Sequence, residues 1–223
     1  MKFSKNIARG AGALAVAAVV VVAAVASAGP PDGKGGGKGK NKPPPPVESP
    51  EPDPDPDPPP STSVDADDVE FVEMMIPHHF QATVMGDMAT SQAGTEEIRA
   101  WAERISVEQD VEIGMMQNWQ TWNGLDVTDA ESAYEMMLGM PMMMEQMGMA
   151  SPEELDQLSA SSGADFDRMY LELMITHHEG AIDMLVEVIT DGSDDVLSGW
   201  ATEMLTTQTW QVEEMRIMLD EMS

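Results

Sequence analysis

The chain has 223 residues, 40 of them acidic and 11 basic, so its formal net charge at pH 7 is −29. Such an acidic surface repels nucleic acid and anionic lipid, so we expect no nucleic-acid partner, and it attracts cations. An acidic coat that only maintains solubility is the alternative interpretation. Cysteine is absent and methionine occurs 22 times, so stability comes from packing or from a metal rather than from disulfides.

The first 28 residues have the pattern of a secretory signal peptide. A basic start precedes the apolar run "AGALAVAAVVVVAAV", and a small-x-small cleavage site ends at Ala28. The apolar run is slightly short for a membrane-spanning helix, and an uncleaved membrane anchor is the alternative. Both interpretations predict an exported protein, located in the periplasm, at the cell surface or in the medium.

Residues 29–65 are predicted to form a linker. They contain 13 of the 16 prolines and the glycine-rich stretch "GKGGGKGKNK". This composition gives a flexible or extended spacer that cannot build a core. Residues 66–223 are long enough for one domain with one core. They contain 33 acidic residues against four arginines, so the whole charge imbalance belongs to this domain.

Residues 66–122 are predicted to form a helical hairpin. Its first helix has a stripe at steps of three and four residues, made of Phe71, Met75, His78, Ala82 and Met85. Pro77 is expected to kink this helix beside the histidines "PHH" at 77–79. The segment "SQAG" at 91–94 ends the helix, and Thr95 is a suitable N-cap for the next one. The second stripe contains Ile98, Trp101, Ile105, Gln109 and Met116.

Residues 123–163 are predicted to be a connector rich in methionine, with eight methionines between 134 and 150. Gly139, Pro141 and Gly148 weaken any regular helix there, whereas Ser151 begins a short helix that ends near Ala160. Thioethers on a flexible chain are a second candidate site for soft cations. A hydrophobic lid that packs on the bundle or on a partner is an equally open interpretation.

Residues 164–221 repeat the first hairpin at an offset of 99 positions. Twelve residues are identical between 68–119 and 167–218, and the chain's four histidines form two matched pairs. The segment "DGSDD" at 191–195 makes the turn, with Ser193 or Asp194 as the cap. We interpret this pattern as an internal duplication. Two hairpins that are each apolar on one face bury those faces against each other, which predicts an all-α four-helix bundle with pseudo-twofold symmetry.

The duplicated pairs present imidazole and thioether groups on the apolar helix faces. Soft thioethers with imidazole suit Cu(I), and imidazole with oxygen suits Cu(II). The candidate metal ligands are His78, His79, His177, His178, Met75, Met85, Met174 and Met184. For each methionine taken singly, core packing is the stronger interpretation. His79 and His178 point about 100° further round their helices, so at least one residue of each pair is expected to face solvent or the other hairpin.

Polar residues near the histidines are candidates for supporting roles. Gln109 and Gln208 occupy equivalent positions in apolar stripes, and each is expected to orient an imidazole through a hydrogen bond or to reach solvent at the bundle end. Glu73 and Glu172 are candidate carboxylate ligands, with a solvated face as the alternative.

The sequence resembles the family of domain of unknown function number 305. The resemblance rests on "MMIPHH" with "AxxM" in the first half and on "FDRMYLELMITHHEGAIDM" in the second, and it covers residues 66–220. It implies a ferritin-like four-helix bundle, usually exported, and some members, of the CopM type, are implicated in copper binding through His and Met. Carried across, it implies metal binding at the eight candidate ligands. Thr176 departs from the proline usual in the second motif.

These observations lead to an expected function and two alternatives. We expect an exported copper-binding protein that buffers, sequesters or passes on Cu(I) or Cu(II), with metal ions and a copper donor or acceptor protein as partners. A structural or protein-interaction domain without metal is the alternative. A ferritin-like di-iron enzyme is disfavoured, because the residues three before each histidine are not glutamate, so we expect no enzyme. The oligomeric state is not predicted.

Overall fold

The computed structural model describes residues 64–222. The predicted signal peptide and nearly all of the predicted linker lie outside the described residues. The helices are α1 (Ala66–Gln92), α2 (Glu96–Trp122), α3 (Ala130–Met137), α4 (Pro141–Gln146), α5 (Pro152–Ala160), α6 (Ala164–Asp191) and α7 (Asp195–Glu221). Residues 64–222 contain no strand, so the all-α prediction is confirmed. Within the same residues, no helix is both long enough and apolar enough to cross a bilayer.

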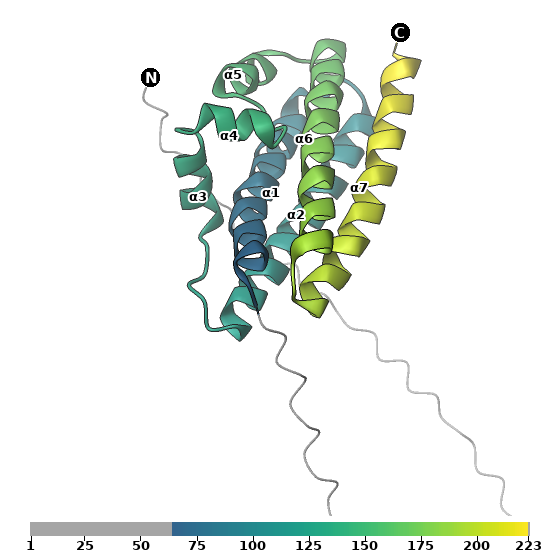
Figure 1. Cartoon of the computed structure of the whole chain (residues 1–223). Coiled ribbons are helices and arrows are strands. Elements are labelled where there is room, and N and C mark those ends of the chain that lie inside the picture. Colours follow the sequence, from purple (N-terminus) through teal and green to yellow (C-terminus); the bar gives the residue numbers. More distant parts are fainter. Residues whose placement is uncertain (1–63, 223) are drawn as a thin grey trace, which may run out of the picture. The chain divides into compact units, whose positions relative to one another are not determined.

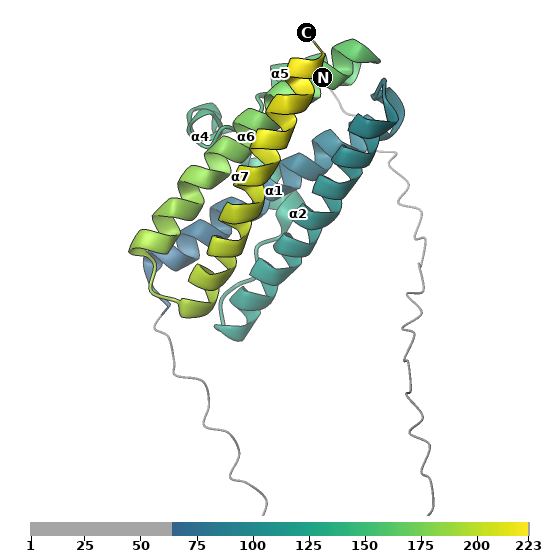
Figure 2. The ribbon, with the colours of Figure 1, turned by 90° about the vertical axis from the view of Figure 1, so that its right-hand side faces the viewer.

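The four long helices form two hairpins, α1–α2 and α6–α7, which pack against each other mainly through α1 and α6 (Figures 1 and 2). The core consists of two hydrophobic clusters that follow one another along α1 and α6 in opposite order. One cluster contains Met85 and Met174, and the other contains Met75 and Leu185. The histidine pairs lie between them on both helices, at the middle of the bundle.

The helix boundaries follow from the capping residues, as predicted. The Thr95 side chain accepts a hydrogen bond from the Ile98 N–H and begins α2. Asp194 accepts from the Leu197 N–H and begins α7, so Asp194 rather than Ser193 is the cap. Ser151 begins α5 with a capping box. These side chains satisfy backbone N–H groups that have no partner within the helix.

Two equivalent buried aspartates tie each hairpin turn to the first helix of the other hairpin. Asp68 of α1 accepts hydrogen bonds from the backbone N–H of Ser193 at 3.1 Å and of Asp194 at 3.1 Å, in the α6–α7 turn. Asp167 of α6 accepts from the Gly94 N–H at 2.8 Å, in the α1–α2 turn. The pseudo-twofold axis therefore relates two reciprocal clamps, one at each end of the bundle.

The connector lies on the side of the bundle formed by α1 and α6 (Figure 1). Helix α3 ends before Gly139, and Pro141 occupies the first turn of α4. Proline is suited to this position because a backbone N–H there would have no partner within the helix. Gly148 has φ +68°, and a Cβ atom there would overlap the carbonyl of Thr176 on α6. Regular helix is thus absent at Gly139 and Gly148, as predicted, whereas Pro141 begins α4, and the helices α3 and α4 were not predicted. At Gly148 the connector lies directly against α6.

Candidate functional site

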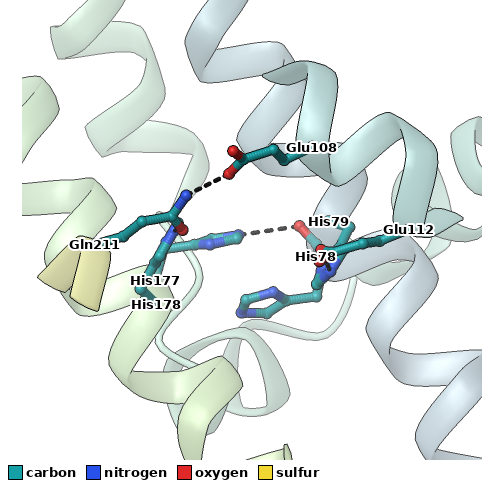
Figure 3. Close-up of polar contacts among 7 residues, drawn as sticks. All are labelled: His78, His79, Glu108, Glu112, His177, His178 and Gln211. Atoms are coloured by element: carbon teal, nitrogen blue, oxygen red, sulfur yellow. Dashed lines mark hydrogen bonds and ion pairs between the residues drawn. The ribbon is translucent and has the colours of Figure 1, made fainter. Parts of the chain in front are cut away.

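The four histidines form a fully buried layer at the centre of the bundle. His78 and His79 lie on α1, His177 and His178 lie on α6, and each has an exposed fraction of 0%. The pseudo-twofold axis brings the equivalent residues His78 and His177 together, with ring centroids 3.7 Å apart and ring planes inclined by 32°. Figure 3 shows the pairs facing each other from the two hairpins.

The two central imidazoles are held by main-chain carbonyls. His78 Nε2 lies 3.0 Å from the carbonyl oxygen of Met147, which belongs to the connector. His177 Nε2 lies 3.0 Å from the carbonyl oxygen of His78. A carbonyl can only accept, so each Nε2 carries a proton and donates it. The connector therefore makes the two central histidines inequivalent, because it supplies the acceptor for only one of them.

The two outer imidazoles are held by side chains of the second helix of their own hairpin. His79 Nε2 lies 2.8 Å from Glu112 Oε2 on α2, and His178 Nε2 lies 2.9 Å from Gln211 Oε1 on α7. The Gln211 amide then donates to Glu108 of α2 at 2.5 Å, which joins the two hairpins (Figure 3). The expectation that at least one residue of each pair faces solvent or the other hairpin is met by His78 and His177, which lie against each other across the two hairpins. No histidine faces solvent. The second helix of each hairpin packs over the outer histidine and buries it.

The side chains that orient the outer histidines are not those predicted. Gln109 and Gln208 are buried, but Oε1 of Gln109 and both amide atoms of Gln208 have no hydrogen-bond partner. Glu112 and Gln211, three residues further along α2 and α7, hold the imidazoles instead. Their positions are also related by the 99-residue offset. A polar pair at duplicated positions was the signal that could have identified them.

All four Nδ1 atoms are buried without a hydrogen-bond partner. Because each Nε2 is engaged with a hydrogen-bond partner, the neutral tautomer with its proton on Nε2 leaves a lone pair on Nδ1. Burial lowers the pKa of His78 and of His177 well below the usual range, and the neighbouring histidines lower both further. Burial also lowers the pKa of His178, to about 4. These imidazoles are therefore neutral at pH 7, which is the form that binds metals.

The four predicted methionine ligands do not share one environment. Met75, Met85 and Met174 are fully buried, on opposite sides of the histidine layer. Met184 is only partly buried and lines a surface cleft. Core packing and a ligand role are both compatible with this arrangement.

Carboxylates do not complete a preformed metal centre. Glu73 and Glu172 are exposed, which agrees with a solvated face. Among residues 64–222, no group of three or more His, Asp or Glu side chains is arranged to hold a metal ion. The donors that fit a metal are the unpartnered Nδ1 atoms and the thioethers that flank them, a set suited to soft cations.

A family model and several solved structures match this chain. The model "Domain of unknown function (DUF305)" matches residues 68–219. A DUF305 protein from Streptomyces coelicolor, designated a secreted protein, is 28% identical with a TM-score of 0.60, over 70% of this chain and 93% of that one. A DUF305 fragment from Deinococcus radiodurans is 25% identical with a TM-score of 0.62, over 71% and 98%.

The similar structures also include CopM with metal bound. CopM in the Cu(I)-bound form is 26% identical with a TM-score of 0.53, over 68% of this chain and 94% of that one. CopM in the Cu(II)-bound form is 25% identical with a TM-score of 0.54, over 69% and 95%. CopM has also been solved with Ag bound. No curated protein matches this chain at a significant level.

Proposed function

Because the chain belongs to the DUF305 family, and because the similar protein CopM has been solved with copper bound, we propose that it is an exported copper-binding protein. It binds Cu(I) or Cu(II) at the buried histidine layer and buffers, sequesters or passes on the ion. A copper donor or acceptor protein is the partner that this role requires. The proposal assigns no catalytic role.

One observation carries the proposal. Four imidazoles lie in the core with every Nδ1 atom unpartnered, although an unsatisfied buried polar atom costs about 1–3 kcal/mol. A fold that needed the histidines only for packing would be more stable with apolar residues there. Coordination by a metal would give these lone pairs a partner. An ion bound at the layer would draw on the buried thioethers on its own side, either Met75 or Met85 with Met174.

Each residue of the layer has a distinct part in holding an ion. Glu112 accepts from His79 Nε2 and makes the opposite nitrogen more basic, while the neutral amide of Gln211 orients His178 without this charge. The carbonyl of Met147 fixes the ring of His78. Copper bound here would be shielded from water by both hairpins. It would act as a soft or borderline Lewis acid that these donors bind.

A copper competition titration tests the proposal. We expect the full chain to take Cu(I) from a chromophoric chelator, and we expect the variant with all four histidines changed to glutamine to take up less Cu(I), because it lacks the ion held by the imidazoles. Glutamine preserves volume and polarity, and circular dichroism checks that the variant stays helical. Binding that persists unchanged in the folded variant would contradict the proposal. Binding by neither protein would also contradict it and would favour the interaction-domain alternative.

A second prediction concerns the hydrogen bond between Glu112 and His79, which is 2.8 Å long. Glu112→Gln is expected to weaken copper binding about tenfold, because an amide raises the basicity of the imidazole less than a carboxylate does. Competition titrations of both proteins measure the ratio. Glu103→Gln on the same helix is the matched control, since Glu103 is exposed and its replacement changes the charge equally. Equal weakening in both variants would show a general charge effect instead.

A further inference from the structure

A cleft on the surface of the bundle lies between α1, α6 and the connector. Its volume is about 330 Å³. Four of its lining residues are methionines that come from three segments distant in sequence: Met74 on α1, Met184 on α6, and Met143 and Met147 in the connector. Met147 is buried, whereas the other three are only partly buried. Thioethers from separate elements thus line one cavity that is open to solvent.

The rest of the cleft wall carries charge of one sign. Asp67 and Glu70 on α1, and Asp183, Glu187 and Asp191 on α6, line the cavity and are exposed, and no Lys, Arg or His lines it. Acidic walls raise the local concentration of cations. Carboxylates alone attract any cation, whereas thioethers select soft ones such as Cu(I) and Ag(I). The cleft combines both properties in one place.

The most buried methionine of the cleft also contacts the histidine layer, through its main chain. Met147 lines the cavity, and its carbonyl oxygen is the acceptor 3.0 Å from His78 Nε2. A small movement of the connector segment around Met147 therefore changes both the cleft and the position of the central imidazole.

We propose that the cleft is a separate capture site for a soft monovalent cation, Cu(I) or Ag(I), bound by the thioethers of Met74, Met143, Met147 and Met184. The ion then reaches the buried imidazoles through the Met147–His78 contact. This transfer rests on the copper-binding function proposed above, whereas capture in the cleft does not. Met184 is accordingly a ligand of the cleft and not of the buried histidine layer.

The test is a titration of the full chain with Ag(I), monitored by NMR of methyl-¹³C-methionine and ¹⁵N-histidine. We expect the methyl signals of the cleft methionines to shift first and the imidazole signals to follow. Single methionine-to-leucine variants assign the methyl signals. If the methyls of Met75, Met85 and Met174 shift before those of the cleft, capture in the cleft is ruled out.

A variant and a matched control measure the affinity of the cleft. The triple change Met74→Leu, Met143→Leu and Met184→Leu preserves apolar volume and is expected to weaken binding of the first Ag(I) at least about tenfold. The control, Met136→Leu with Met142→Leu, alters exposed connector methionines that lie outside the cleft and should leave the affinity unchanged. Equal weakening in both proteins would overturn the proposal in favour of general thioether binding.

The four-histidine variant separates the two proposals. If its cleft methyls still shift with Ag(I) as in the unchanged protein, the cleft is an independent site, whatever the histidines do. If the unchanged protein shows cleft shifts without any imidazole response, the capture site stands and the histidine function fails. Loss of the cleft shifts in the folded four-histidine variant would overturn an independent capture site.

Discussion

Acidification from about pH 7 to about pH 5 is expected to destabilise the metal-free protein by about 2 kcal/mol through His178 alone, given its folded-state pKa of about 4 against an ordinary 6.5. The protonated imidazole is disfavoured in the core and free to form in the unfolded chain. The contribution of neutral His178 to the free energy of unfolding is therefore fully present above the unfolded-state pKa. It is lost as the pH falls from the unfolded-state pKa towards the folded-state pKa. His78 and His177, whose pKa values are also lowered, add to the loss.

Urea unfolding followed by circular dichroism at each pH measures this effect. The window lies above the range in which most carboxylates titrate, so relief of the repulsion within a chain of net charge −29 does not mask it. The control is His178→Gln, which removes the titrating group and retains an amide beside Gln211; its stability should depend less on pH. An unfolding midpoint that does not move between the two pH values would show that the core does not hold these histidines neutral.

Gly180→Ala is expected to destabilise the protein by about 3 kcal/mol, the upper range for an overpacked core position. A Cβ atom at this position on α6 would overlap the main-chain carbonyl of Met147 and come within 2.9 Å of the Gly148 nitrogen. Backbone cannot rotate away as a side chain can, so the connector must move. His78 then loses its acceptor, and its ¹⁵N signals should report the change.

Gly199→Ala on α7 is the matched control for this substitution. No heavy atom lies within 4 Å of a Cβ built there. Alanine is a better helix former than glycine, so this change should stabilise the protein by about 0.5–1 kcal/mol. If urea unfolding shows that Gly180→Ala lowers the free energy of unfolding and Gly199→Ala raises it, close packing at Gly180 is the cause of the destabilisation. Stabilisation by both would mean that the connector does not press on α6.

The features of the fold that could be predicted are those that depend on residues close together in the sequence. The amphipathic stripes, the caps at Thr95 and Ser151 and the turn at 191–195 each depend on neighbouring residues, and the structure confirms them. The duplication added a long-range constraint, because equivalent residues must be related by one axis. This predicted that the histidine pairs meet, and the rings of His78 and His177 do lie with their centroids 3.7 Å apart.

The partners of the histidines could not be predicted in the same way. A helical stripe shows which face is buried but does not show how far each helix is rotated against its neighbour. Gln109 and Glu112 lie three residues apart on α2. The rotation and axial position of α2 against α1 decide which of the two reaches His79. The acceptor for His78 is a main-chain carbonyl, and every residue carries one. The path of the connector determines that Met147 supplies this carbonyl, and no pattern of side chains in the sequence predicts that path.

The reciprocal aspartate clamps bear on how this bundle could have arisen and how it unfolds. Asp68 secures the turn of the second hairpin and Asp167 secures the turn of the first. Each half of the chain thus contributes an aspartate that binds the turn of the other half. Such an exchange is what two copies of one hairpin make as a symmetric pair, which agrees with the interpretation of the repeat as an internal duplication. Unfolding of either half removes the carboxylate that holds the turn of the other, so the halves should unfold together.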